Sequence, residues 1–234
     1  MQQYEDVFSK IYRDGVWGDG SGDGSNPDFA KPYVDFVSSI VKRLQISSVL
    51  DVGHGDWKMY RDYNFEDTHY TGVDVVEGLS RVNNEKYANK NRIFIQVKPE
   101  SLLPDAELLL CKDVLQHLSF HDIERILNQF SKFRYLVICN DIVPPTFVSL
   151  LSHHLQPKAR LAKILNLKSP FYKVGPINNS NIETGGFRTI DLERTIFSKY
   201  IENFNLVEKM DYSSEHSGRR LKRVLLFKNL KFQQ

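Results

Sequence analysis

The sequence has no long apolar run and very little cysteine, and each absence excludes a class of protein. No stretch approaches the ~18 consecutive apolar residues that a membrane-spanning helix needs, and no charged-then-apolar leader opens the chain. The two cysteines, Cys111 and Cys139, lie inside apolar runs, a position typical of buried, reduced thiols rather than of a disulfide or a metal site. We therefore expect a soluble protein of the cytoplasm, without a membrane span.

A large excess of either positive or negative charge is also lacking, because the sequence has 31 Lys and Arg residues and 29 Asp and Glu residues. A net charge of +2 demands no polyanionic partner, so nucleic acid is not expected to bind. One basic run, at 219–223, suggests otherwise. Its residues alternate between the two faces of an expected strand, so we place the run on the solvated side of an edge hairpin. The run comprises Arg219, Arg220, Lys222 and Arg223.

A glycine pair follows the first apolar run after residue 44. The stretch 47–56, SSVLDVGHGD, reads as a buried strand that ends at Asp51 and feeds a tight turn containing Gly53 and Gly55. About twenty residues later a second strand ends at Asp74, where an open α/β sheet places the carboxylate that receives a ribose hydroxyl pair. The two strand ends indicate a nucleotide-type site. The alternative is an ordinary strand-to-helix turn without a ligand.

The residues after this turn distinguish two nucleotide cofactors. A dinucleotide requires a third glycine to hold its pyrophosphate, but Lys58 occupies that position, and Asp56 and Trp57 precede it. A carboxylate would repel a pyrophosphate, whereas S-adenosylmethionine has no phosphate and carries a sulfonium and an ammonium group. The pattern therefore favours the methyl donor.

The rest of the chain alternates apolar strands with helices, which indicates a parallel sheet covered on both faces. We expect a Rossmann-like, doubly wound α/β fold, with a mostly parallel sheet, a C-terminal antiparallel hairpin and a helical insertion at 144–170. One domain, 1–234, contains N-terminal helices with a glycine-rich loop at 1–44 and an inserted substrate-side segment at 144–188. Helices are expected at 4–13, 28–44, 77–88, 120–133 and from near Asp191, and strands at 47–51, 69–76, 92–97, 106–114, 135–141, 204–214 and 219–229.

These motifs resemble those of a known family. VLDVGHGDW, YTGVDVV and LLLCKDVLQHLS resemble the glycine-rich turn, the ribose acid and the fourth-strand segment of class I S-adenosylmethionine-dependent methyltransferases, and the terminal hairpin is similar to that superfamily's reversed last strand. More narrowly, IYRDGVWGDGSGDGS, CKDVLQHLS and GGFRTIDL resemble a bacterial and viral subgroup often associated with capsule or surface-glycan genes. The chain departs from this subgroup at two places. His54 replaces the usual cysteine between the glycines. Gln96 and Val97 stand where an acid usually receives the adenine amino group, so the Gln96 side chain or the Val97 backbone would substitute.

The resemblance implies that S-adenosylmethionine lies across the strand ends and leaves as S-adenosylhomocysteine. The expected cofactor-binding residues are Trp17, Gly20, Ser21, Asp51, Gly53, Gly55, Asp56, Trp57, Asp74, Val75, Gln96, Val97, Asp113 and Val114. The glycine-rich loop around Trp17 would form a lid over the cofactor, and the alternative is a disordered surface loop. No metal is expected, because neither His117 with His121 nor the adjacent pair at 153–154 has convincing two-ligand geometry.

Methyl transfer to a hydroxyl also requires a base for the proton. His117, just past the fourth strand, is the first candidate because its unperturbed pKa lies near neutrality, and Asp113 and Asp141 are the others. The alternatives are a structural histidine at the start of a capped helix and aspartates that hold the cofactor amine or a neighbouring loop. Arg188 and Glu183 are expected to contact the substrate, and the alternative for Arg188 is a solvated charge at a helix start.

We therefore expect an O-methyltransferase that acts on a hydroxyl of a sugar or glycan terminus. The alternatives are methylation of a small metabolite or a nucleic acid, and a non-catalytic module that binds S-adenosylmethionine. A dehydrogenase is the most distant alternative. The sequence indicates no particular oligomeric state.

Overall fold

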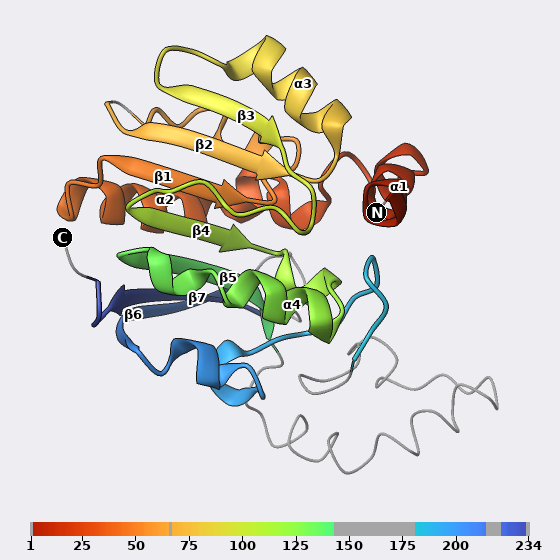
Figure 1. Ribbon diagram of the computed structural model, residues 1–234. Coiled ribbons are helices and arrows are strands. Elements are labelled where there is room, and N and C mark those ends of the chain that lie inside the picture. Colours follow the sequence, from red (N-terminus) through yellow and green to blue (C-terminus); the bar gives the residue numbers. More distant parts are fainter. Residues whose placement is uncertain (1, 66, 143–180, 214–220, 233–234) are drawn as a thin grey trace.

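A seven-stranded sheet forms the centre of the computed structural model, which describes residues 2–65, 67–142, 181–213 and 221–232 (Figure 1). The strands are β1 Ser48–Val52, β2 His69–Asp74, β3 Arg92–Gln96, β4 Leu108–Lys112, β5 Tyr135–Ile142, β6 Phe204–Ser213 and β7 Leu221–Asn229. Their order in the sheet is β3-β2-β1-β4-β5-β7-β6. The first five run parallel, and β7 runs antiparallel to both β5 and β6. The expected mostly parallel sheet with a C-terminal antiparallel hairpin is confirmed.

In the described part of the chain, four α-helices and several short 3-10 turns precede or connect the strands. The helices are α1 Gln2–Arg13, α2 Pro27–Arg43, α3 Glu77–Tyr87 and α4 Phe120–Leu127, and the turns include η1 Asp23–Ser25, η2 Lys58–Tyr60, η3 Leu115–His117, η4 Phe130–Lys132, η6 Leu192–Arg194 and η7 Ser198–Ile201. Side-chain caps explain two helix starts, because Asn26 accepts the Asp28 N–H ahead of α2 and Ser119 accepts the Asp122 N–H ahead of α4. Among the described residues, none of these helices has the length and apolar character needed to cross a membrane.

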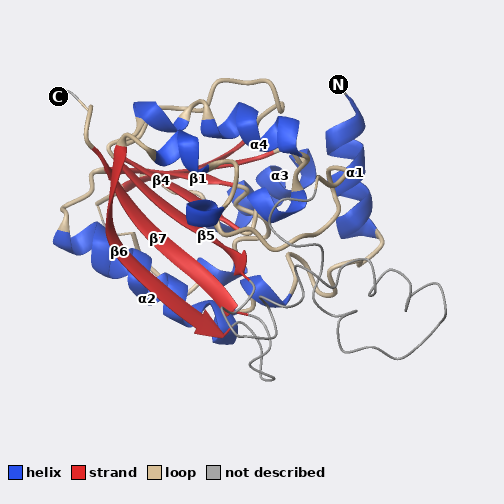
Figure 2. Cartoon of the chain, turned by 90° about the horizontal axis from the view of Figure 1, so that it is seen from below, coloured by secondary structure: helices blue, strands red, loops and turns tan. Residues whose placement is uncertain are grey.

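The period-two alternation of the strands divides the core into two layers. Leu108 and Leu110 of β4 face the layer that contains α2, whereas Leu109 and Cys111 face the layer that contains α4. Seen from below, α2 and α4 lie on opposite faces of the sheet (Figure 2). All five residues of β4 and all eight of β5 are buried, as expected for central strands covered on both sides.

Two helices are shorter than the sequence predicts. The helix expected at 120–133 ends at Leu127, because the Gln129 side chain turns to accept the Leu103 N–H (2.8 Å) and the chain continues as the η4 turn. The helix expected from Asp191 is the three-residue turn η6, which Asp191 caps and which the extended residue Thr195 ends. In the first place a tertiary contact and in the second a local side-chain cap override the helical periodicity.

The expected solvated position of the basic run is wrong for Lys222 and Arg223. The hairpin lies at the edge of the sheet, but β6 is the outermost strand and β7 lies between β5 and β6, where Lys222 and Arg223 are only 3% and 8% exposed. Each is held by buried or half-buried carboxylates, so neither belongs to a solvated face. Arg219 and Arg220 lie outside the described residues, as do the expected insertion at 144–170 and most of the segment 144–188.

Candidate functional site

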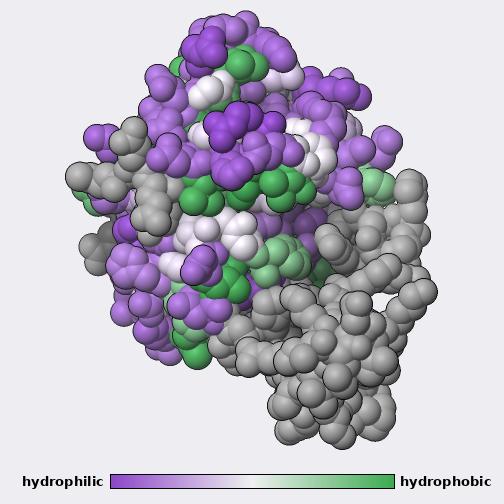
Figure 3. Space-filling model, turned by 90° about the vertical axis from the view of Figure 1, so that its right-hand side faces the viewer, coloured by the Kyte–Doolittle hydropathy of each residue, from purple (hydrophilic) through white to green (hydrophobic). Residues whose placement is uncertain are grey.

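A pocket of about 530 Å³ lies at the carboxyl ends of the parallel strands. Its volume is within the range of small-molecule sites, roughly 300–1,000 Å³. Helix α1 lies beside this edge, toward which strands β1 to β4 point in Figure 1. Figure 3 looks onto the same side of the molecule and shows hydrophobic and hydrophilic surface next to one another. The pocket therefore occupies the position at which open α/β sheets bind ligands.

The turn after β1 requires both of its glycines. Gly53 and Gly55 have φ angles of +75° and +55°, a region in which other residues are strained. A Cβ on Gly53 would lie 2.4 Å from the Val114 side chain, and one on Gly55 would lie 2.4 Å from the Ser21 hydroxyl. His54 between them is buried, and its Nε2 pairs with the Ser80 hydroxyl of α3 (3.0 Å). The unusual histidine thus fixes the turn to α3.

The acid at the end of β2 faces the pocket. One carboxylate oxygen of Asp74 accepts the Gly55 N–H (3.1 Å), and the other accepts the Val76 N–H (3.0 Å). Each oxygen keeps a lone pair for a ligand hydroxyl. Val75 and Val97 line the same side of the pocket, whereas Gln96 does not, because its amide donates to the Val75 carbonyl (3.3 Å).

The glycine-rich loop 15–25, here called the strap, is fastened across this turn. The Ser21 N–H donates to the Asp56 carboxylate (3.0 Å), and the Asp56 N–H donates in return to the Ser21 hydroxyl (2.8 Å). The Tyr12 hydroxyl also pairs with that of Ser21 (2.9 Å). Gly20 allows this approach, since a Cβ there would overlap the Asp56 carboxylate. Gly20 and Asp56 therefore hold the strap and are not among the residues that line the pocket.

The strap carries Trp17 onto His117. The indole and imidazole ring centroids are 4.7 Å apart. His117 Nδ1 lies 2.8 Å from the Gly186 carbonyl oxygen, which can only accept, so Nδ1 carries the proton and Nε2 keeps its lone pair. Burial lowers the pKa of His117, against the opposing effect of the Gly186 carbonyl, so the ring is neutral near pH 7. A neutral ring whose unprotonated Nε2 receives one long hydrogen bond, from the Gln116 amide (3.4 Å), is a competent proton acceptor.

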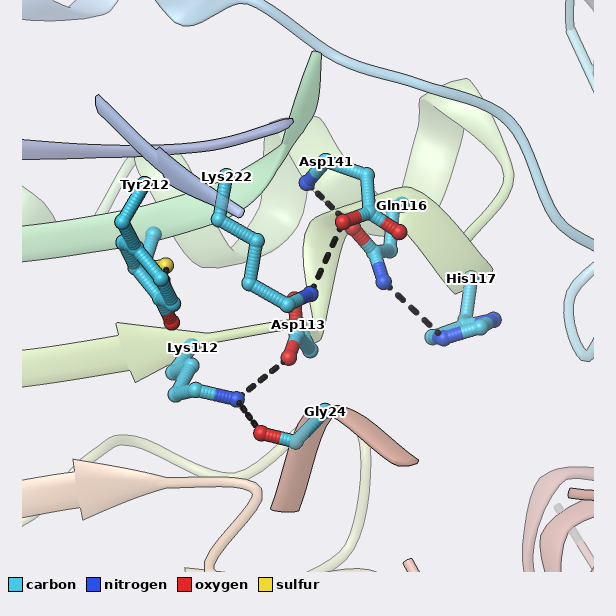
Figure 4. A network of polar contacts seen from close by, with 9 residues as sticks. Gly24, Lys112, Asp113, Gln116, His117, Asp141, Tyr212 and Lys222 are labelled. Atoms are coloured by element: carbon cyan, nitrogen blue, oxygen red, sulfur yellow. Dashed lines mark hydrogen bonds and ion pairs between the residues drawn. The ribbon is translucent and has the colours of Figure 1, made fainter. Parts of the chain in front are cut away.

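A cluster of four charged side chains closes the pocket beside His117 (Figure 4). Asp113 has a left-handed φ of +59°. Its carboxylate accepts hydrogen bonds from the ammonium groups of both Lys112 and Lys222. Lys222 also donates to Asp141 (2.9 Å), and Lys112 donates to the Gly24 carbonyl of the strap (2.7 Å). Burial disfavours ionised Asp113, but the two lysines outweigh it and hold the pKa of Asp113 well below its usual range. Asp113 is thus a counter-ion, not a base.

The expected site residues divide clearly by location. Those that line the pocket are Trp17, Ser21, Gly53, Gly55, Asp74, Val75, Val97, Asp113, Val114, His117 and Asp141. Asp51 is buried on the face of β1 that points away from the pocket, where its carboxylate accepts a hydrogen bond from the Tyr70 hydroxyl (2.6 Å). Trp57 is buried in the aromatic core beside Tyr70 and Phe94. Neither position allows direct contact with a ligand in the pocket, which corrects two of the expected cofactor contacts.

The two expected substrate residues are also elsewhere. Arg188 is fully buried, donates to the Leu115 carbonyl (3.3 Å) and lies over the Phe120 ring (5.1 Å), so it is neither a ligand-gripping cation nor a solvated charge. Burial lowers the pKa of Arg188 to about 10. Glu183 is exposed in a separate depression against α1. Arg188 therefore supports the loop that carries His117, and Glu183 does not reach the pocket.

Sequence reasoning missed Lys112, Lys222 and Gln116, all of which line the pocket. The available signal for Lys112 was a lysine within an otherwise apolar central strand, LLLCKDV, a placement that requires a partner. Among the described residues, no group of three or more His, Cys, Asp or Glu side chains is arranged to hold a metal ion.

Solved structures share this architecture. Magnesium protoporphyrin IX methyltransferase from Synechocystis PCC 6803, with bound S-adenosylhomocysteine, is 17% identical, with a TM-score of 0.58 over 96% of this chain and 93% of that one. The N-methyltransferase NodS from Bradyrhizobium japonicum WM9, in complex with S-adenosylhomocysteine, is 11% identical, with a TM-score of 0.60 over 98% and 99%. The chain has the class I methyltransferase fold.

The methyltransferase fold alone does not fix the chemistry. The [4+2]-cyclase SpnF is as similar, with 13% identity and a TM-score of 0.58 over 97% of this chain and 94% of that one. No protein-family model matches the chain, and no curated protein matches it. The function of the chain therefore depends on the groups that line its pocket.

Proposed function

We propose that the chain is an S-adenosylmethionine-dependent methyltransferase that acts on a hydroxyl of a sugar or glycan terminus. The observation that carries the proposal is His117, a neutral imidazole with an unprotonated Nε2, in a pocket whose other side offers a glycine turn and a ribose-type acid. An O-methyltransferase needs both features, since a hydroxyl is a poor nucleophile until its proton is removed. The subgroup resemblance supports a sugar as the acceptor.

The residues around the glycine turn fit the methyl donor. Asp74 retains acceptor lone pairs for ribose hydroxyls, and Val97 and Val114 offer apolar surface for the adenine base. When bound, S-adenosylmethionine supplies an electrophilic methyl group on a sulfonium centre and leaves as S-adenosylhomocysteine. No phosphate-binding set of backbone N–H groups is needed, in keeping with the Asp56 carboxylate beside the turn.

The side chains of the protein orient the acceptor and remove its proton. His117 Nε2 accepts the hydroxyl proton, while Gly186 and Trp17 hold the ring in one tautomer and one orientation. The Gln116 side chain connects Asp141 to His117, because its carbonyl oxygen accepts the Asp141 N–H (2.8 Å) and its amide N–H donates to His117 Nε2 (3.4 Å). The strap covers the pocket and keeps water from the acceptor.

Isothermal titration with S-adenosylhomocysteine tests the donor half of the proposal. Asp74→Ala removes an acceptor for two ribose hydroxyls, so we predict a loss of about 1–3 kcal/mol in binding free energy. Asp62→Ala is the matched control, because Asp62 is an exposed acid that pairs with its neighbour Arg61. No binding to the unmodified protein, or equal affinities for the two variants, would contradict the proposal.

Methyl transfer itself is tested by incubating the protein with S-adenosylmethionine and a panel of methyl glycosides. Mass spectrometry should show the gain of one methylene unit on at least one sugar. Small metabolites and RNA in parallel reactions distinguish the alternative acceptors. Nucleic acid is a weaker candidate acceptor than the basic run at 219–223 suggests, because Lys222 and Arg223 are buried in ion pairs and cannot contact phosphates. The role of 144–188 as a substrate-side segment stays a prediction.

A further inference from the structure

The pocket has a second, charged end whose lysine the proposed reaction has not used. Asp141 and Lys222 come from strands β5 and β7, and their Cα atoms are directly opposed in the antiparallel register. The Lys222 ammonium therefore reaches both Asp141 and Asp113, and all three side chains line the pocket next to His117 (Figure 4). We call Asp141 and Lys222 the acceptor pair.

The acceptor pair has hydrogen-bonding capacity that the described residues leave unused. Lys222 has three N–H donors, of which two go to Asp113 and Asp141. Asp141 accepts Lys222 through Oδ1, and the described part of the chain gives Oδ2 no donor. Both side chains are almost completely buried, at 3% and 6% exposure, and both line the pocket. A polar ligand group beside them would receive one hydrogen bond and donate another.

The charges of this end are already balanced. Two lysines, Lys112 and Lys222, face two aspartates, Asp113 and Asp141, within hydrogen-bonding distance. An acceptor with its own charge would leave one buried charge uncompensated, which is strongly unfavourable. Burial alone would lower the pKa of Lys222, but the negative charges of Asp113 and Asp141 have the larger effect and raise it. Lys222 is therefore charged across neutral pH, and the two positive and two negative charges stay balanced. A neutral acceptor fits this end.

We propose that Lys222 and Asp141 bind two adjacent hydroxyl groups of a neutral polyol, Lys222 donating to one and Asp141 accepting from the other. A vicinal diol matches the pair because each hydroxyl both donates and accepts. One of the two hydroxyls then lies next to His117, and Lys222 stabilises the negative charge that develops on its oxygen. The inference rests on the proposed function and narrows its substrate to neutral sugars with neighbouring free hydroxyls.

The test measures sugar binding to the full chain saturated with S-adenosylhomocysteine. Neutral methyl hexopyranosides of gluco, galacto and manno configuration are screened by saturation-transfer NMR, and the tightest is titrated beside its monodeoxy analogues and its uronate. Removal of either of two adjacent hydroxyls should weaken binding roughly tenfold, the value expected for a hydrogen bond to a charged group. The uronate should bind more weakly than the neutral sugar.

Three variants connect this preference to the acceptor pair. Lys222→Met should weaken sugar binding roughly tenfold or more and abolish the effect of deleting the hydroxyl it holds. Lys222→Arg, which keeps the charge, should restore part of the affinity. Asp141→Asn should weaken binding similarly and, being isosteric, serves if Lys222→Met does not fold. Lys209→Met is the control, since Lys209 is an exposed lysine of β6 paired with Glu193.

Specific outcomes overturn the inference. They are the absence of binding by every neutral glycoside, tighter binding of the uronate, sensitivity only to non-adjacent hydroxyls, or unchanged sugar affinity in Lys222→Met and Asp141→Asn. If S-adenosylhomocysteine itself does not bind the unmodified protein, the proposed function fails instead, so the two failures are distinguishable.

Discussion

At the scale of single residues, Gly24 shows how closely the strap approaches the charged cluster. A Cβ on Gly24 would lie 2.8 Å from an Asp113 carboxylate oxygen and 3.3 Å from Lys222 Nζ. That carboxylate cannot swing away, because two lysines hold it. We predict that Gly24→Ala lowers the free energy of unfolding by about 1–3 kcal/mol through overpacking, as measured by urea denaturation.

Gly78 provides a control of opposite sign. It lies in α3, where a Cβ would have no atom within 4 Å and φ is not positive. Gly78→Ala should therefore stabilise the protein by about 0.5–1 kcal/mol, the usual helix-propensity gain. If both alanine variants were stabilising, the close packing of the strap against Asp113 would be wrong.

His117 makes a second residue-scale prediction, which concerns its tautomer and pKa. Because burial lowers the pKa of His117, the neutral and therefore basic form should persist to lower pH than in an exposed histidine, whose pKa is about 6.5. Long-range proton–nitrogen NMR spectra should show the Nδ1–H tautomer and a midpoint below that value. His117→Gln assigns the signal. An Nε2–H tautomer, or a midpoint at or above the exposed value, would remove the proposed base.

At the scale of elements, the reciprocal bonds between Ser21 and Asp56 fasten the strap to the glycine turn. We predict that Asp56→Ala makes the strap susceptible to limited proteolysis and lowers S-adenosylhomocysteine affinity by about 1–3 kcal/mol, since the charge-assisted bond from the Ser21 N–H to the half-buried Asp56 carboxylate is lost. Asp19→Ala is the matched control within the strap, because its carboxylate is 97% exposed and its ion pair with Lys58 contributes little. Equal behaviour of the two variants would show that the strap is held by other contacts.

The strands were predictable because their apolar runs are continuous and bounded by polar turns, which leaves a buried parallel sheet as the simplest solution. The short turn at 192–194 was not, since the side-chain cap of Asp191 and the extended Thr195 decide it. The face of Asp51 was in principle predictable. Period-two alternation puts Asp51 on the side of Val49, toward α2, and not toward the pocket.

At the scale of the whole molecule, the site is assembled from residues far apart in the chain. Lys222 follows Asp113 by 109 positions and meets it only because β7 returns antiparallel beside β5 in a particular register. A single sequence predicts that a hairpin forms but not which residues of it oppose Asp141. The glycine turn and Asp74 could be predicted from the sequence because they lie within one strand–helix–strand unit. The acceptor pair could not, because its two residues are far apart in the chain.

Global stability should also depend on pH through Asp51. Burial raises the pKa of Asp51 from 3.8 to about 6, although the Tyr70 hydroxyl acts against it. The folded state therefore binds this proton more tightly, and the stabilisation is complete below the unfolded pKa and lost as pH rises through about 6. Asp51→Asn fixes the neutral form and keeps an acceptor for Tyr70.

The stability of Asp51→Asn relative to the unmodified protein should consequently increase between about pH 5 and about pH 8, by on the order of 1–3 kcal/mol. Urea denaturation of both proteins at each pH measures it. Asp113 contributes with the opposite sign, because its pKa is lowered on folding, so its stabilisation is present at neutral pH and lost in acid. Both proteins contain Asp113, so its contribution cancels in the difference. If the difference did not change with pH, Asp51 would not be protonated more readily in the folded chain. The conclusion that burial on this face of β1 raises the pKa of Asp51 would then be wrong.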